Sequence, residues 1–316
     1  MRGYRYEILI PIYNDWESLK PLMERIRSAT SAELFQQLRF TIVNDCSSLH
    51  MDYSLLPHAA PLTVIELGRN MGHQKAIAVG LSHIQYHSQA DWVIVMDGDG
   101  EDKPEDVEKL IRHATENPDK IVFASRSKRH DKLVFRAFYA CYKGLFRLLT
   151  GRRIFFGNFC IIPRPLLQNL VYYSEIWSHF SGGIIRSRLP YTSIPLERGR
   201  RFAGDSKMNF LDLMLHGLSS IAIYVDVISM RLLLMTVLLM LLSLAGMVVV
   251  LVIRLFTNLA IPGWATFAVL GFAIIALQAF LMSILLAFIV LHFKTQTLVI
   301  PTKDYGTFIN DVKLSE

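Results

Sequence analysis

The sequence predicts an α/β protein in which a doubly wound, mostly parallel sheet is followed by a two-helix transmembrane hairpin. Two observations support this. Short apolar runs alternate with amphipathic stretches through the first half of the chain, a pattern typical of parallel sheets covered by helices. Later, the apolar runs at residues 232–253 and 264–291 are each long enough to cross a bilayer, which takes about 20 residues.

The composition supports a membrane protein. Of 316 residues, 52% are hydrophobic, and the mean hydropathy of +0.33 exceeds that of ordinary soluble domains. Three scattered cysteines argue against a disulfide framework and suit the cytoplasm. Arg2, Arg5 and Glu7 interrupt the N-terminus, so we expect no signal peptide. A formal charge of +6 suits an anionic membrane surface or a phosphorylated substrate. No nucleic-acid-binding motif accompanies this charge, so no nucleic-acid partner is expected.

The first part of the chain reads as strands separated by helices. Helices are expected from Trp16, from about residue 73 to 87 and from Pro104, because apolar residues recur there at helical spacing. In such sheets ligands bind beyond the carboxyl ends of the strands, where the loops after the strands should converge. The expected strands are residues 6–13, 40–43, 62–67, 92–96 and 121–124, followed by a strand-like segment at 155–163.

The stretch DWVIVMDGDGEDKPED, residues 91–106, dominates the candidate site. A buried strand ends there in Asp97, Asp99, Glu101 and Asp102. Clustered acids beside a buried strand are costly unless a cation compensates them, and Mg²⁺ and Mn²⁺ prefer carboxylate oxygen. The alternative is an acidic, glycine-rich surface turn. Its position directly after a buried strand favours the metal site.

Three further stretches each have two interpretations. The glycine loop 68–72 either brings backbone N–H groups to a phosphate or is an ordinary turn, since it matches neither a Walker loop nor a full dinucleotide fingerprint. The basic stretch 126–153 is either a helix on a membrane surface or a core helix with a solvated basic face. The cationic stretch 198–207 is either a linker or a clamp on phosphates.

Charges that flank the apolar runs predict their orientation. Lys207 and Arg231 before the hairpin, and Lys294 and Lys303 after it, outnumber Arg254 in the connection, so both ends should face the cytoplasm. We therefore expect a multi-pass protein of the inner (plasma) membrane with a cytoplasmic catalytic domain. The expected parts are a catalytic domain at 1–207, an interfacial helical linker at 208–230, the hairpin at 231–293 and a cytoplasmic tail at 294–316.

Four motifs together resemble the family 2 glycosyltransferases with the nucleotide-sugar-binding GT-A fold. They are IPIYND at 10–15, IVNDCSS at 42–48, NMGHQKAIAVGL at 70–81 and MDGDGEDKPED at 96–106. The chain is most similar to the polyprenyl-phosphate glycosyltransferases, which include dolichyl-phosphate mannose synthases and bacterial lipid-linked glucosyltransferases. The similarity covers nearly the whole chain, including both apolar runs. It implies a GT-A-like sheet and inverting transfer of a sugar from a UDP- or GDP-linked donor to a polyprenyl phosphate at the cytoplasmic face.

The resemblance also implies roles for individual residues. It places Asp97, Asp99 and Glu101 around Mg²⁺ or Mn²⁺ and the donor diphosphate. It implies that Asp99, Arg126, Arg201 and Lys207 are catalytic. The implied donor-binding residues are Pro11, Tyr13, Asp15, Asp45, Gly72 and Asp97. The implied acceptor-phosphate residues are Arg126, Arg136, Arg201, Ser206 and Lys207.

The chain departs from the family pattern at two positions. Glu101 stands where family members commonly have Gln, which alters the charge at the expected metal. Asn158 stands in Gly157-Asn158-Phe159-Cys160 where the family often has Gly-Asp-Phe-Arg. The Asp is a natural candidate for a catalytic base, and Asn cannot serve as one. Either this position is not a base in this enzyme, or the alignment misleads.

Two other functions remain open. A processive polysaccharide synthase shares the sheet and the acidic motif, but it usually carries Q-x-x-R-W after the acidic loop. The nearest string here, residues 36–40, lies before that loop and ends in Phe. A membrane scaffold with a decayed site is favoured by Asn158 and disfavoured by the intact Asp97, Asp99, Arg201 and Lys207. The oligomeric state is open, a homo-oligomer included.

Overall fold

The chain forms two compact units. The computed structural model describes residues 4–53, 56, 60–126, 144, 146–151, 156–203, 219, 221–257, 263–295 and 299–315. The first unit comprises Met1–Tyr139, Ile154–Ile223 and Leu298–Glu316, and the second comprises Ala140–Arg153 and Tyr224–Thr297. The second unit is therefore inserted into the sequence of the first.

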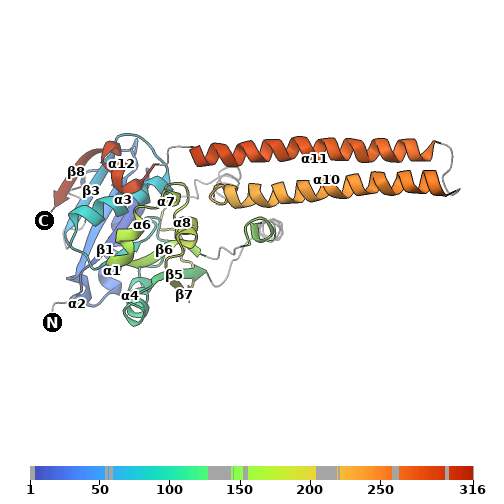
Figure 1. The fold of residues 1–316 in the computed structure, drawn as a ribbon. Helices are drawn as coiled ribbons and strands as arrows, with labels where there is room; N and C mark the ends of the chain where they lie inside the picture. Colours follow the sequence, from blue (N-terminus) through green and yellow to red (C-terminus); the bar gives the residue numbers. More distant parts are fainter. Residues whose placement is uncertain are drawn as a thin grey trace. The chain divides into compact units, whose positions relative to one another are not determined.

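The first unit is built on an eight-stranded sheet with the order β7-β5-β6-β4-β1-β2-β3-β8 (Figure 1). Four neighbouring pairs are parallel and three, β3–β8, β4–β6 and β5–β6, are antiparallel. The prediction of a mostly parallel α/β sheet is thus confirmed. The strands are β1 (Tyr6–Ile12), β2 (Leu38–Asn44), β3 (Leu62–Leu67), β4 (Trp92–Val95), β5 (Ile121–Arg126), β6 (Phe156–Pro163), β7 (Tyr191–Leu196) and β8 (Ile309–Ser315).

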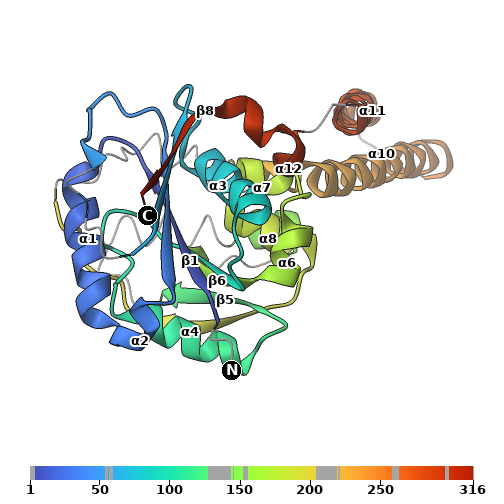
Figure 2. The ribbon, with the colours of Figure 1, turned by 90° about the vertical axis from the view of Figure 1, so that its left-hand side faces the viewer.

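Helices cover both faces of this sheet. Side chains alternate along a strand, so Ile8 and Ile10 of β1 join one core cluster with α1 and α4, whereas Leu9 joins the other with α3, α6, α7 and α8. Figure 2 shows α1 on one side of the sheet and α3 and α8 on the other. The helices are α1 (Trp16–Ala29), α2 (Ala32–Phe35), α3 (His73–His87), α4 (Asp106–Glu116), α6 (Arg164–Leu170), α7 (Glu175–Ser178) and α8 (Phe180–Ser187).

The C-terminal end differs from the tail that we expected at 294–316. Pro301–Asp304 forms helix α12, Tyr305–Phe308 forms the 3₁₀ helix η2, and β8 pairs antiparallel with β3 at the edge of the sheet. Leu298–Glu316 therefore belongs to the first unit. The sequence did not reveal this because β8 is a short edge strand with polar residues, and its partner lies near the start of the chain. Of the expected linker at 208–230, residues 208–218 and 220 lie outside the described residues.

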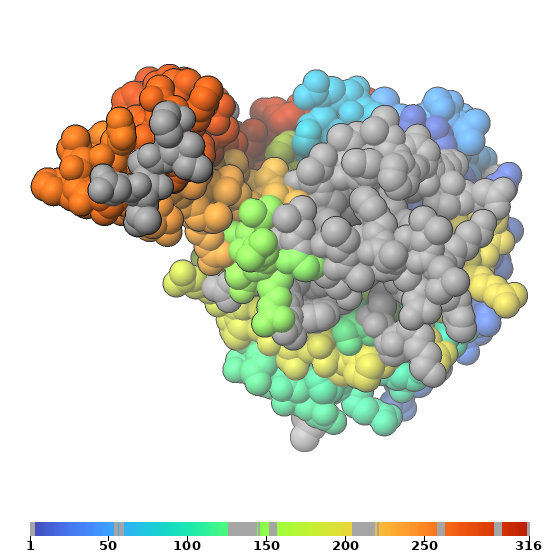
Figure 3. Space-filling view, turned by 90° about the vertical axis from the view of Figure 1, so that its right-hand side faces the viewer, coloured from blue at the N-terminus to red at the C-terminus, as the bar shows by residue number. Residues whose placement is uncertain are grey.

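The second unit is dominated by two long apolar helices that form a hairpin. They are α10 (Val225–Phe256) and α11 (Trp264–Thr295), and they lie side by side in two perpendicular views (Figures 1 and 3). The Thr236 and Ser283 hydroxyls are 2.8 Å apart, and the ring of Phe272 fills the space above Gly246. Both helices are long and apolar enough to cross a membrane. They contain the predicted runs 232–253 and 264–291.

Candidate active site

The candidate site lies where neighbouring strands end. Strands β2, β1 and β4 are parallel neighbours, so their carboxyl ends meet at one edge of the sheet. The loops after β1 and β2 are joined directly: the backbone N–H of Asn14 donates to the Ser47 hydroxyl (2.9 Å), and the Asn14 side-chain oxygen accepts from the N–H of Leu49 (2.9 Å). The expected convergence of these loops is present in the structure.

Asp45 is buried and holds the glycine loop. Its Oδ1 accepts a hydrogen bond from the backbone N–H of Met71 (2.6 Å), and its Oδ2 accepts one from Gly72 (2.8 Å). Burial raises the pKa of Asp45, against the opposing effect of these two amides. The carboxylate therefore fixes the 68–72 loop in place, while its contact with a nucleobase remains a prediction.

The acidic loop after β4 has a shape that depends on two glycines. A Cβ on Gly98 would lie 2.2 Å from Cδ1 of Ile12, and Gly100 adopts a φ of +84° against the ring of Phe202. Within the loop, the N–H of Asp97 donates to Asp102 Oδ2 (2.9 Å) and the N–H of Glu101 donates to Asp99 Oδ1 (2.9 Å). The loop is thus a specific, internally bonded structure after a buried strand.

The segment 198–202 lies against this acidic loop. The N–H of Gly199 donates to the carbonyl of Glu101 (2.7 Å), and the N–H of Phe202 donates to the carbonyl of Asp99 (3.0 Å). Arg198 pairs with the Glu101 carboxylate. Arg201 bridges two loops, with its guanidinium 2.7 Å from Asp15 Oδ2 and 3.7 Å from Asp99 Oδ2. Arginines from one segment therefore compensate acids from two others.

The two arginines do not return the pKa of Asp99 to its ordinary value. Burial and the neighbouring Asp97 raise the pKa of Asp99 to about 6, although Arg201 and Arg198 act in the opposite direction. Oxygens of Asp97, Asp99 and Glu101 are the donors that Mg²⁺ and Mn²⁺ prefer, so the residues fit the predicted metal chemically. Among the described residues, no three His, Cys, Asp or Glu side chains form a ready metal cage. The metal ligands remain a prediction, and the two arginines would have to exchange partners.

His73 is a site residue that the sequence did not single out. It begins α3, and its Nε2 lies 3.1 Å from Asp97 Oδ1 and 3.0 Å from the side-chain nitrogen of Asn158. Burial lowers the pKa of His73, but the carboxylates of Asp97, Asp102 and Asp99 together outweigh this effect, and the net shift is upward. His73 therefore connects the glycine loop, the acidic loop and β6. The only signal in the sequence was its place directly after Gly72.

Of the other predicted residues, three are described by the structure and three are not. Pro11 is buried in β1 and Tyr13 is 45% exposed after it. Arg126 is the last residue of β5, in register with Leu196 of β7; β5 runs parallel to β4, so it ends at the same edge as Asp97. The predicted residues Arg136, Ser206 and Lys207 lie outside the described residues.

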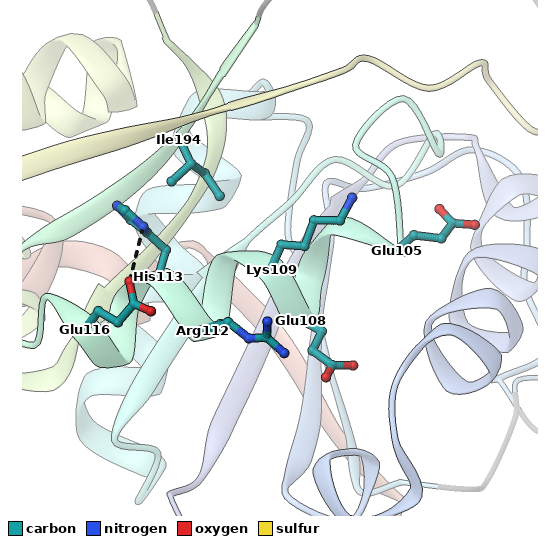
Figure 4. A pocket seen from close by; sticks show the side chains of 7 residues that line it. All are labelled: Glu105, Glu108, Lys109, Arg112, His113, Glu116 and Ile194. Carbon is teal, nitrogen blue, oxygen red and sulfur yellow. Dashed lines mark ion pairs between the residues drawn. The ribbon is translucent and has the colours of Figure 1, made fainter.

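A hollow along the outer side of α4, beside β7, has no evident relation to this site. Figure 4 shows its lining of charged side chains from α4 and its N-terminal turn, with Ile194 of β7, and an ion pair between His113 and Glu116 at 3.9 Å. None of the residues 97–102 of the acidic loop lines it. We therefore place the chemistry at the carboxyl ends of the strands.

Similarity to known proteins identifies the family. The family model described as "Glycosyl transferase family 2" matches residues 7–171, just over half of the chain. The chain is 25% identical over 290 residues to "Uncharacterized glycosyltransferase YkcC" of Bacillus subtilis (strain 168), covering 85% of this chain and 83% of that one. It is 28% identical over 221 residues to the undecaprenyl-phosphate 4-deoxy-4-formamido-L-arabinose transferase of Salmonella choleraesuis (strain SC-B67). That match covers 66% of this chain and 64% of the relative, slightly under two thirds of its length.

A solved structure shows the same fold. The glucosyl-3-phosphoglycerate synthase of Mycobacterium tuberculosis, crystallised with Mn²⁺, UDP-glucose and phosphoglyceric acid, superposes with a TM-score of 0.52 at 14% identity. The superposition covers 71% of this chain and 80% of that one, and at this identity it speaks for the fold alone. With the family model spanning both the glycine loop and the acidic loop, the chain belongs to glycosyl transferase family 2.

Proposed function

We propose that the protein transfers a sugar, with inversion at the anomeric carbon, from a nucleotide-sugar donor to a polyprenyl phosphate at the cytoplasmic face of a membrane. One observation carries this proposal. In a family 2 chain, a structured acidic loop at the end of β4 is joined through Arg201 to the loop after β1. Two long apolar helices follow in the same chain.

The donor side is supported by chemistry at the strand ends. Asp45, Gly72, Asp97 and Asp15 lie in loops at one edge of the sheet, and the Mycobacterium synthase with a similar fold holds Mn²⁺ and UDP-glucose. We assign Mg²⁺ or Mn²⁺ to Asp97, Asp99 and Glu101. Bound there, the cation would neutralise the leaving diphosphate. The protein's own part is to place the donor and to gather these carboxylates in one structured loop at the end of β4.

The acceptor side is supported by cations and by Asn158. A sugar hydroxyl normally needs a positioned carboxylate base, which Asn158 does not provide. A phosphate monoester has a second pKa of about 6 and is already largely a dianion near neutral pH, so it needs cations to orient it. Arg126 and Arg201, together with Arg136, Ser206 and Lys207, are assigned to that task. The Salmonella relative is named for transfer to undecaprenyl phosphate.

Incubation with labelled donors tests the reaction. We expect purified protein with Mn²⁺ or Mg²⁺ to move label from one member of a panel of UDP- and GDP-sugars into the lipid phase when undecaprenyl phosphate is present. Undecaprenol, which lacks the phosphate, is the matched acceptor control and should stay unlabelled. Transfer to a free glycan hydroxyl with polyprenyl phosphate inert would overturn the acceptor assignment. Binding of nucleotide diphosphate without any turnover would favour the decayed scaffold.

Labelling from outside intact cells tests the membrane topology. In a background without the native cysteines, a cysteine at position 258, between the two apolar helices, should react with an impermeant maleimide. A cysteine replacing Leu314, which is 75% exposed on β8, should react only after the cells are broken. Reaction of the Leu314→Cys probe from outside would contradict two crossings with cytoplasmic ends.

A further inference from the structure

We propose that the C-terminal segment 299–315, which follows the second apolar helix, is a positioning element of the donor site. It holds the 68–72 loop in the conformation in which Met71 and Gly72 bind Asp45. The inference rests on the proposed function, from which it takes the identity of the donor site. It adds that the affinity for the donor depends on residues that lie beyond the hairpin in the sequence.

The first support is the strand that leads into the glycine loop. Strand β8 pairs with β3 along its whole length, with Leu67 opposite Ile309. Contact continues into the loop itself, because the N–H of Gly68 donates to the carbonyl of Phe308 (3.0 Å). The entry to the loop is therefore fixed by backbone hydrogen bonds from the C-terminal segment.

The second support is the helix that leaves the loop. Tyr305 of η2 stacks on Tyr86 of α3, with ring centroids 5.9 Å apart and planes 5° from parallel. Its hydroxyl lies 3.2 Å from Nε2 of His87, and the Thr302 hydroxyl donates to the Tyr86 hydroxyl (2.8 Å). The same short segment thus contacts β3, which enters the loop, and the C-terminal end of α3, the helix that leaves it.

The third support reaches β2, the strand that ends directly before Asp45. Nζ of Lys313 lies 3.4 Å from the Glu66 carboxylate and 4.9 Å from the ring centroid of Tyr53. Glu66 also accepts hydrogen bonds from the Tyr53 hydroxyl and from the side-chain nitrogen of Asn44 (2.6 Å). Asn44 directly precedes Asp45. The C-terminal segment is therefore connected both to β2, which ends directly before Asp45, and to the loop whose N–H groups donate to Asp45.

These contacts should act on donor binding more than on chemistry. The N–H groups of Met71 and Gly72 must both reach the Asp45 carboxylate before the loop can bind the donor. Ordering a loop in this way has an entropic cost for each residue. A loop that is ordered in advance spares the ligand that cost. Loss of the C-terminal support should therefore raise KM for the donor and the Kd for nucleotide, with kcat nearly unchanged.

Substitutions at Gly68 test the backbone contact. A Cβ there would meet only the carbonyl oxygen of Phe308, at an ordinary 3.9 Å, so Gly68→Ala keeps the N–H that donates to Phe308 and serves as the reference for Gly68→Pro. Gly68→Pro removes the N–H that donates to Phe308. Calorimetric titration with UDP and with GDP, in the presence of Mn²⁺, should give a Kd about five- to tenfold higher for Gly68→Pro, as expected for one net hydrogen bond.

If Gly68→Pro does not fold, substitutions at Lys313 test the same inference. Lys313→Met should raise the donor KM severalfold at unchanged kcat, and Lys313→Arg should return KM to the wild-type value. Leu314→Ala changes the exposed neighbouring side chain and is the matched control. A merely structural role would lower the thermal unfolding midpoint with KM unchanged. Nucleotide Kd and donor KM at wild-type values in Gly68→Pro and Lys313→Met would overturn this inference and leave the proposed function standing. A wild type that binds neither nucleotide would overturn both.

Discussion

Asp99→Asn should leave a folded protein whose transfer rate is lower by about a hundredfold or more, the usual loss when one electrostatic contact to the transition state is removed. Asn has the shape of Asp and can still accept the hydrogen bond from the N–H of Glu101. What it lacks is the charge that we assign to the metal and the diphosphate. The rate is measured as labelled sugar recovered in the lipid phase.

The same substitution should not destabilise the fold. Burial and Asp97 raise the pKa of Asp99 from 3.8 to about 6, so the folded protein binds more protons than the unfolded chain between about pH 4 and 6. Wild-type stability therefore falls as the pH rises through this window, whereas Asp99→Asn lacks that loss. At pH 7.5 the variant should unfold at the same temperature as the wild type or above it, with no advantage below pH 4.

Two controls accompany this experiment. Glu105→Gln removes a half-exposed acid that pairs with Arg25 at the start of α4, and it should keep the wild-type rate. Excess chelator should abolish transfer by the wild type. Near-normal turnover in excess chelator would contradict the metal assignment, whatever the effect of Asp99→Asn.

Arg201→Ala should also lower transfer to polyprenyl phosphate by about a hundredfold or more, since it removes a charge-assisted contact that we place on the phosphates. Its guanidinium reaches Asp15 and Asp99 at once, so the variant leaves both carboxylates less compensated. A lysine is a point charge and cannot span two acids in this way, so Arg201→Lys should recover only part of the rate. Arg112→Ala, on the exposed side of α4, is the matched control. A wild-type rate in Arg201→Ala would contradict the assignment.

Asn158→Asp should change the rate by less than about tenfold, because a positioned base typically contributes a factor of about 10²–10⁴ and the proposed acceptor does not need one. The new carboxylate would lie beside His73 and near Asp97, where it adds negative charge. Transfer is measured with polyprenyl phosphate and with a glycan hydroxyl in parallel. A hundredfold gain toward the hydroxyl would show that the site had lacked a base.

The elements that could be predicted are those whose residues carry their own signal. β1 and β4 are buried on both faces; β4 is a continuous apolar run, and β1 is one apart from Glu7. Helix α1 shows its buried face through Leu19, Leu22 and Ile26 at helical spacing. The position of the site followed from topology, because parallel strands end at one edge. Here local pattern and global fold agree.

The remaining features depend on contacts between distant parts of the chain. The pair of His73 and Asn158 forms only because β6 is placed antiparallel between β4 and β5. Arg201 was predicted to hold phosphate, yet the structure places it on Asp15 and Asp99, since a cation pairs with whichever acids the fold brings near. Spacing along the sequence does not reveal such partners.

The insertion of the hairpin into the first unit sets an order of events during synthesis. Domains generally form as the chain emerges, N-terminal parts first, and β8 is synthesised after both apolar helices. Until then β3 presents an unpaired edge, and the 68–72 loop lacks the neighbour that our inference makes necessary. If the hairpin enters the bilayer as proposed, full affinity for the donor is reached only after both crossings have been made. A chain released early would be anchored yet bind the donor weakly, so unfinished molecules at the membrane would compete poorly for it.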